Sequence, residues 1–341
     1  MIEYEYHGRA SLGVLGRVRV MKTLIGFDIG GTKTAIVEGT YKAEVLQRRE
    51  VETEANKSFS HTFPQLTTIA DELIENATLA GRKVTAVSVS VGGPLEIAAG
   101  VLHDPPHLPG WHGVQLKREL ESRFPGYPVR IEHDGNAGAL AEFSFGIGSE
   151  LLGLQHLVFL TLGTGLGAGI ILNGRIHRGA NDTAGELGHI RLSSDGPFLH
   201  GKAGSWEGLC SGVGMLELAR QMFPSEWRKE SSIKELVEAM LAGKEDALAV
   251  AQEAGIWLGR GLAILIDLLN PEVIVLGSLA VVLGDLLLVP ARQILRVEAL
   301  PTALRACRIM PARLGKSIGD VAALMAVLND PELRYRFHQN L

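Results

Sequence analysis

Apolar residues occur along this chain in two successions of the same kind. Short apolar runs predict strands at residues 22–27 and 35–38, and again at 157–162 and 169–172. In each pair a glycine-rich stretch separates the two runs, which predicts a tight turn between neighbouring strands. A less regular run at 45–53 extends the first group with a third strand. The same plan therefore appears once in each half of the chain.

Helical and strand-like segments alternate after each strand pair. Apolar residues recur at helical spacing over 63–79, and a β-branched run at 84–91 predicts a buried strand ending at Gly92-Gly93-Pro94. The other predicted elements are a loop at 103–113, a helix near 116–124, a strand at 129–132, helices at 137–145, 206–222, 232–241 and 247–269, a strand at 273–276 and a helix at 320–328. This order indicates an α/β protein with an internal duplication.

The two glycine-rich turns are the first candidates for chemistry. They read Asp28-Ile-Gly-Gly-Thr-Lys-Thr34 and Gly163-Thr-Gly-Leu-Gly167. Consecutive backbone N–H groups in such turns attract phosphate oxygens, and Asp28 could hold Mg²⁺ through water. Thr32 stands where a P-loop needs lysine, and a strand rather than a helix follows each turn, so neither is a P-loop or a dinucleotide fingerprint. An ordinary hairpin turn is the alternative interpretation.

Carboxylates and histidines form a second group of candidates. Asp134 follows a strand and precedes a helix, where it could serve as a general base or merely cap the helix. Glu186, His189 and Glu207 could surround a polyhydroxylated ligand, or hold a metal ion. His103, His107 and His112 share one loop without the spacing of metal ligands, which favours surface or substrate-loop roles.

Charge and cysteine content narrow the class of protein. The net charge of −5 disfavours binding of nucleic acid through the overall field, and two cysteines among 341 residues suit a reducing cytoplasm. No secretory signal is visible. Residues 151–174 lack acidic and basic side chains, but glycines interrupt them, which favours two buried strands over a membrane helix.

Together these motifs resemble the ROK family (repressors, open reading frames, kinases) of the actin, hexokinase and Hsp70 superfamily. The resemblance extends from about Met21 to about Leu328. The segments that carry it are 28–33, 108–111, 134–142, 161–165, 184–189 and 273–277. It implies two actin-like (ribonuclease H-like) α/β domains with a cleft between them. The expected division is an N-terminal extension at 1–20, poorly ordered, one domain of 21–133 plus 316–341, and a second of 134–315.

The resemblance also implies an activity. It predicts ATP-dependent phosphorylation of a hexose or N-acylhexosamine, with glucose at O6 as the leading candidate and Asp134 as general base. The expected sugar-binding residues are Gly93, His107, Trp111, His133, Asp134, Glu186, His189 and Glu207. The expected nucleotide-binding residues are Asp28, Gly30, Gly31, Thr32, Lys33, Gly163, Thr164, Gly165 and Gly277, with Mg²⁺ at Asp28. A cytoplasmic homodimer without nucleic-acid or membrane partners is expected.

Three departures from the family pattern leave alternatives open. Residues 201–208 lack the cysteines of the family's zinc motif, so no zinc site is expected. His133 and His107 stand where asparagine is common, which leaves the identity of the sugar open, and polyphosphate remains an alternative donor. The rival functions are a sugar-responsive repressor, disfavoured because only some twenty residues precede the first strand, a non-catalytic sugar binder, and a kinase for a non-sugar acceptor.

Overall fold

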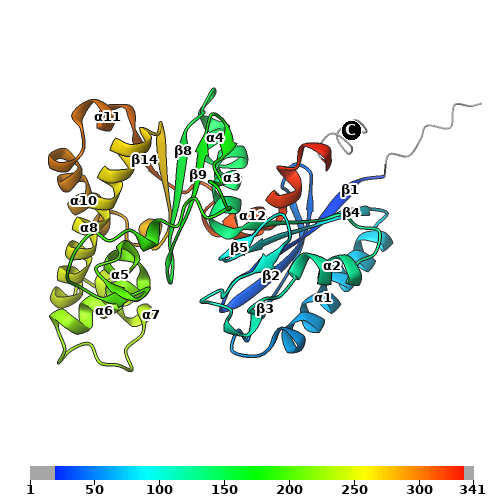
Figure 1. Ribbon diagram of the computed structural model, residues 1–341, viewed down its shortest axis with the longest axis horizontal. Coiled ribbons are helices and arrows are strands. Elements are labelled where there is room, and N and C mark those ends of the chain that lie inside the picture. The colour runs from blue at the N-terminus through cyan, green and yellow to red at the C-terminus, as the bar shows by residue number, and fades with distance from the viewer. Residues whose placement is uncertain (1–19, 334–341) are drawn as a thin grey trace, which may run out of the picture.

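The computed structural model of the protein describes residues 20–333 and contains two five-stranded sheets with helices around them (Figure 1). The predicted N-terminal extension, apart from Val20, lies outside the described residues. The two sheets have equivalent strand orders, β3-β2-β1-β4-β7 and β10-β9-β8-β13-β14. In each, the first three strands along the chain are antiparallel and the last two are parallel to the first, so the predicted duplication is confirmed.

The first sheet is covered on both faces. Its strands are β1 (Lys22–Ile29), β2 (Lys33–Thr40), β3 (Val45–Glu52), β4 (Lys83–Val91) and β7 (Val129–His133). Helices α1 (Phe59–Leu79) and α2 (Leu116–Arg123) pack on one face, and α12 (Ile318–Leu328) packs on the other. Gly39 allows α12 to approach, because an added Cβ would lie 2.3 Å from Leu324. The central strands β1 and β4 are consequently buried along almost their whole length.

The second sheet carries most of the helices. Its strands are β8 (Leu157–Leu162), β9 (Leu166–Leu172), β10 (Arg175–Ile176), β13 (Val273–Ser278) and β14 (Arg308–Pro311). The helices on this side are α5 (Trp206–Cys210), α6 (Gly212–Met222), α7 (Ile233–Leu241), α8 (Glu245–Leu269), α9 (Leu279–Leu283), α10 (Asp285–Glu298) and α11 (Pro301–Ala306). Helix α8 is long and apolar enough to cross a membrane, but it packs against α5, α6, α7 and α10, as a core helix does.

Two helices lie between the sheets. Helix α3 (Asp134–Phe145) packs on β8 and β9 of the second sheet, α12 packs on the first sheet, and the two helices contact each other (Figure 1). One hydrophobic cluster includes residues of both sheets and both helices. This is the arrangement of two actin-like domains, and it brings the start of α3 to the boundary between them.

The structure corrects some predicted elements. The single helix expected at 206–222 is wrong, because it divides at Ser211, whose hydroxyl accepts from the N–H of Gly214 (3.1 Å) and caps α6. Helices α10 and α11 and strand β14 were not predicted. The remaining short elements are β5 (Leu95–Glu96), β6 (Val101–Leu102), η1 (Pro109–Trp111), α4 (Ile147–Glu150), η2 (Leu187–His189), β11 (Phe198–Leu199), β12 (Lys202–Ala203) and η3 (Gly315–Ser317).

Candidate active site

The first glycine-rich turn connects β1 to β2 and is held in one shape by Thr53. The Thr53 N–H donates to the carbonyl of Thr32 (2.9 Å), and its hydroxyl donates to the carbonyl of Gly30 (2.6 Å). Gly31 must lack a side chain, since a Cβ would lie 2.6 Å from the carbonyl oxygen of His107. Thr53 directly follows β3 and was not identified from the sequence. These bonds fix the turn before any ligand binds.

Lys33 forms an ion pair with Glu50. Its ammonium group lies 2.5 Å from Glu50, which also pairs with Arg48, and Arg48 donates to Asp320 (2.8 Å). This network joins the strand after the first turn to the first turn of α12. A contact between Lys33 and phosphate stays a prediction.

The second glycine-rich turn connects β8 to β9 and rests against the start of α6. The carbonyl oxygens of Gly163 and Thr164 accept from the N–H groups of Gly212 (2.9 Å) and Val213 (3.0 Å). A Cβ on Gly163 would meet only the Ser278 hydroxyl, at 4.0 Å, so there is open space beside this glycine. The turn therefore has a fixed backbone and room for a ligand next to it.

The end of β13 lies beside this second turn. Ser278, which sequence reasoning missed, has a φ of 54° and bonds through its hydroxyl to that of Thr161 (2.8 Å). Gly277 is buried, and an added Cβ would lie 3.2 Å from the ring of Phe159. Because Gly277 has no side chain, the end of β13 fits against the Phe159 ring of the neighbouring strand β8. Contact of Gly277 with a nucleotide stays a prediction.

Asp134 is the first residue of α3 and lies at the edge where β1, β4 and β7 end. Its side chain is 50% exposed, and one oxygen accepts from the N–H of Gly135 (2.7 Å). The other oxygen faces Gly92 in the loop after β4, 3.6 Å from where a Cβ would stand. The capping residue of α3 is His133, so the alternative of Asp134 as helix cap is wrong. Its carboxylate therefore remains open to a ligand.

Asp28 is the last residue but one of β1 and lies at the same edge of the sheet. An added Cβ on Gly319, in α12, would lie 2.4 Å from an Asp28 carboxylate oxygen, so this glycine makes room for it. Burial, followed by the negative charge of Asp134, raises the pKa of Asp28 to about 7. Two carboxylates that repel each other in a partly buried place form a donor set that fits a hard divalent cation such as Mg²⁺.

His133 lies between Asp134 and Glu186. Its Nδ1 is 3.4 Å from a carboxylate oxygen of Asp134, and its Nε2 is 3.7 Å from one of Glu186. A Cβ on Gly93 would lie 2.8 Å from the imidazole ring, so the loop after β4 closes over it. The structure thus brings together four of the residues that the sequence assigned to sugar binding.

Behind His133, a carboxylate joins the two domains. Glu132, at the end of β7, is 2% exposed and accepts from both terminal nitrogens of Arg178 (2.9 and 2.5 Å). It also accepts from the backbone N–H of His133 (3.0 Å) and the amide of Asn136 (3.1 Å). Burial opposes the charge of Arg178, but its bonds to Glu132 raise its pKa overall. The sequence analysis did not find this ion pair.

His189 and Glu207 lie on the second domain, and both contact His200. The rings of His189 and His200 stack with centroids 3.9 Å apart, and burial, then His200, lowers the pKa of His189. His200 bonds to one oxygen of Glu207 (2.8 Å), and the other oxygen accepts from the N–H of Leu166 (2.7 Å). Contact of His189 and Glu207 with a sugar stays a prediction.

The loop predicted to face the sugar presents His107 but not Trp111. His107 is exposed beside the first glycine turn, whereas Trp111 is fully buried and packs edge-on against Phe59 with ring centroids 5.0 Å apart. Trp111 therefore supports the loop from the core of the first domain, and a contact between its ring and a sugar stays a prediction.

Two further features bear on ligand sites. Within residues 20–333, no group of three or more His, Cys, Asp or Glu side chains is arranged to hold a metal ion, and the absence of zinc stays a prediction.

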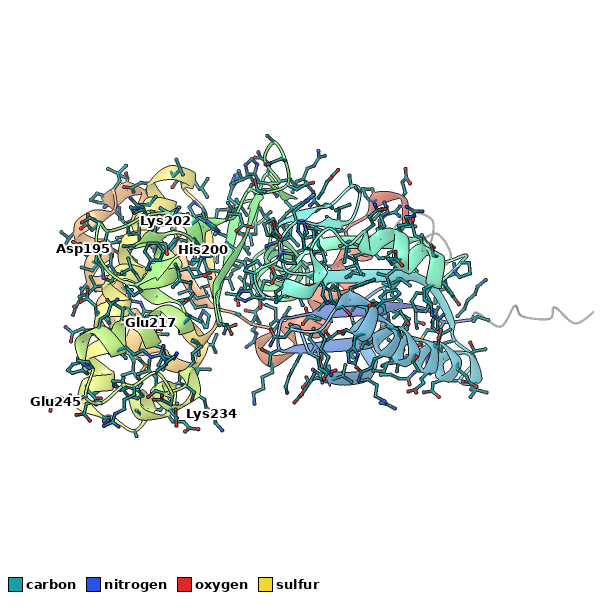
Figure 2. The ribbon with its side chains drawn as sticks, turned by 60° about the horizontal axis from the view of Figure 1, so that its bottom comes forward. Asp195, His200, Lys202, Glu217, Lys234 and Glu245 are labelled. Atoms are coloured by element: carbon teal, nitrogen blue, oxygen red, sulfur yellow. The ribbon has the colours of Figure 1, made fainter. Side chains whose placement is uncertain are left out.

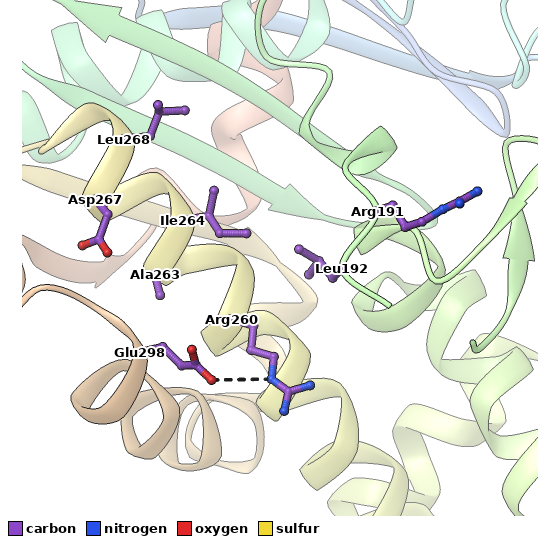
Figure 3. A pocket seen from close by; sticks show the side chains of 8 residues that line it. All are labelled: Arg191, Leu192, Arg260, Ala263, Ile264, Asp267, Leu268 and Glu298. Atoms are coloured by element: carbon purple, nitrogen blue, oxygen red, sulfur yellow. Dashed lines mark ion pairs between the residues drawn. The ribbon is translucent and has the colours of Figure 1, made fainter. Parts of the chain in front are cut away.

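A groove lies between Arg191 and Leu192 on one side and helices α8 and α10 on the other, where Arg260 and Glu298 are 4.0 Å apart (Figure 3). None of the predicted site residues lines it.

Comparison with known proteins places these features in a family. A sequence model described as "ROK family" matches residues 24–329. A glucokinase of Halalkalibacterium halodurans is 32% identical over 314 residues, covering 86% of this chain and 92% of that protein. A putative xylose repressor of Caldicellulosiruptor is 29% identical over 317 residues, covering 90% of this chain and 78% of that protein. Relatives of this chain thus include both an enzyme and a regulator.

A solved structure has the same fold. The ROK family glucokinase of Streptomyces griseus, in complex with glucose and AMPPNP, superposes with a TM-score of 0.71 at 30% identity. The match covers 88% of this chain and 97% of that one. The fold predicted from the sequence, two actin-like α/β domains, is therefore confirmed.

Proposed function

The chain belongs to the ROK family, and we propose that it is an ATP-dependent sugar kinase acting on a hexose or N-acylhexosamine, with glucose at O6 as the leading candidate. The observation that carries this proposal is the open carboxylate of Asp134. It stands at the sheet edge shared with Asp28. Both glycine-rich turns are fixed by backbone bonds and lie on separate domains, as a site for the phosphates of one nucleotide requires.

Asp134 is the proposed general base. It would accept the proton of the sugar hydroxyl while that oxygen attacks the γ-phosphorus of ATP, and the bond from γ-phosphorus to the ADP oxygen breaks in line. Asp134 is the first residue of α3, so a helix positions its carboxylate at the sheet edge. His133, within 3.4 Å of it, would orient this carboxylate and bring Glu186 toward the sugar.

The remaining site residues are proposed to bind and orient. The first turn (Gly30, Gly31, Thr32, with Lys33) and the second (Gly163, Thr164, Gly165) would hold phosphates, and Gly277 would lie toward the nucleoside. Asp28 would hold Mg²⁺ through water, and that ion would neutralise charge on the transferred phosphoryl group. Gly93, His107, Glu186, His189 and Glu207 would contact the sugar. We place residues 21–133 with α12 in one domain and 134–315 in the other.

A sugar-responsive regulator is the second candidate, because the xylose repressor matches over most of this chain. A regulator needs to bind its sugar but not to transfer phosphate. Asp134 is half-exposed, and backbone hydrogen bonds fix both glycine-rich turns. These two features favour the kinase. The two functions also differ in their need for nucleotide.

Release of ADP from Mg-ATP across a panel of hexoses and N-acetylhexosamines tests the proposal. We expect turnover with at least one sugar, and loss of about a hundredfold or more in kcat for Asp134→Asn, which keeps the shape but removes the base. Sugar binding by calorimetry without any turnover, from ATP or polyphosphate, would contradict the kinase and favour the regulator or the binder.

A further inference from the structure

The hairpin of β11 and β12 places His200 within hydrogen-bond distance of the buried carboxylate of Glu207. Leu199 pairs with Lys202, so His200 and Gly201 alone form the turn, with φ values of 54° and 71°. Two residues with positive φ are typical of a type I′ turn, which suits the twist of a two-residue hairpin. His200 and Lys202 are labelled on the second domain in Figure 2. From the tip of this turn, His200 reaches Glu207.

Glu207 is held from two sides. It lies in α5, is 9% exposed, and follows Trp206, which is fully buried. One carboxylate oxygen bonds to His200 (2.8 Å) and the other accepts from the backbone N–H of Leu166 (2.7 Å). A nearly buried carboxylate that lost one of these partners would shift toward water or another donor. The position of Glu207 therefore depends on His200.

Leu166 follows directly on the second glycine-rich turn. A Cβ on Gly165 would lie 2.7 Å from the same Glu207 oxygen that accepts from Leu166, so the carboxylate is packed against the turn. The opposite side of the turn is bonded to Gly212 and Val213. The turn is thus fixed between α6 on one side and Glu207 on the other.

We propose that His200 is a positioning residue for the second glycine-rich turn, which it fixes through Glu207 so that the turn is preformed for the phosphates of a nucleotide. The proposal rests on the proposed function only in that the turn binds nucleotide. His200 also stacks on His189, so the same ring adjoins the proposed sugar side. The hairpin of β11 and β12 thus holds Glu207 through the His200 side chain, and residues 198–207 contain no cysteine.

The test compares two substitutions of His200 that differ in reach. His200→Asn keeps a residue that tolerates positive φ and favours a type I′ turn before glycine, but its amide is too short to reach Glu207. His200→Gln places an amide donor at about the distance of the imidazole Nε2. Phe198→Ala, on the same hairpin and 71% exposed, serves as the control. Binding of Mg-ADP is measured by calorimetry, with thermal unfolding of each variant.

We expect His200→Asn to weaken Mg-ADP binding by about tenfold, the usual effect of losing one charge-assisted bond, and to lower the unfolding temperature by only a few degrees, because Glu207 keeps its bond to Leu166. His200→Gln should bind within about threefold of wild type, and Phe198→Ala should match it. Equal binding by wild type and His200→Asn would overturn the positioning role while leaving the kinase standing. A wild-type protein that binds no nucleotide would overturn the proposed function, and this proposal with it.

Discussion

Removal of the Arg178 guanidinium tests whether the Glu132–Arg178 ion pair supports the sheet edge that holds Asp134. Arg178→Ala would leave the Glu132 carboxylate, 2% exposed, with only the N–H of His133 and the amide of Asn136 as donors. Breaking a buried ion pair costs about 3–5 kcal/mol, and because the Arg178 side chain is 32% exposed, water offsets part of this. We therefore expect the free energy of unfolding to fall by about 2–4 kcal/mol.

The same variant should lose activity, because Glu132 also bonds to the residue before the proposed base. Water or a new partner drawn to the unpaired carboxylate would displace the junction of β7 and α3, where Asp134 begins. We expect kcat/KM to fall by about tenfold or more, since small displacements of a general base are costly. Urea unfolding and steady-state kinetics measure the two effects separately.

Arg82→Ala is the matched control. Arg82 binds Glu38 through two bonds of 2.8 Å, and Glu38 is likewise buried, but the pair lies within the first domain at the start of β4, away from the edge that holds Asp134. This variant should lose comparable stability and keep kcat/KM within about twofold. If both variants reduced activity equally, or if Arg178→Ala cost less than about 1 kcal/mol, the reasoning would be refuted.

Three further predictions follow from packing and charge. Gly163→Ala fills open space beside the second turn, so Mg-ADP affinity should fall with no change in unfolding temperature; unchanged affinity would show that phosphate binds elsewhere. Gly261→Ala would place a Cβ 2.0 Å from the buried indole of Trp206, and should cost about 1–3 kcal/mol in urea unfolding despite alanine's better helix propensity. Burial alone would raise the pKa of Glu38, but bonds from Arg82 and Gln47 lower it, so its stabilising contribution is present above its unfolded pKa and lost as pH falls through its folded one. Wild type should therefore lose more stability than Glu38→Gln between about pH 5 and pH 3.

The sequence predicted the parts of the fold that depend on local pattern. The strand pairs around both glycine turns, the buried strand before Gly92 and the long helices follow from periodicity and from glycine or proline at their ends. The break at Ser211 was missed because the residues on both sides are compatible with one helix. The cap from Ser211 is local, but the N–H of Gly212 also donates to the carbonyl of Gly163, which is distant in sequence.

The same limit applies to the candidate site. The sequence singled out Asp28 and Asp134 separately, and the structure places both at the edge where the parallel strands β1, β4 and β7 end. Thr53, Arg178 and His200 were not found, because each acts through a partner in another element. Arg178 and Glu132, for example, are separated by 46 positions. A residue's chemistry can be read from the sequence, but the residue that holds it in place depends on the packed structure.

Of the three carboxylates around α3, Asp134 is the one left open to a ligand. Glu132, just before the helix, is saturated by Arg178 and two further donors. Glu142, near its end, is fully buried and accepts from the N–H groups of Ile147 (3.0 Å) and Leu314 (2.9 Å), the latter in the segment that returns to α12. Both flanking carboxylates thus fasten α3 to its surroundings. Asp134 alone among them is half-exposed, and no arginine or lysine pairs with it in the described ion pairs, so a rigid helix presents a carboxylate that a ligand can reach.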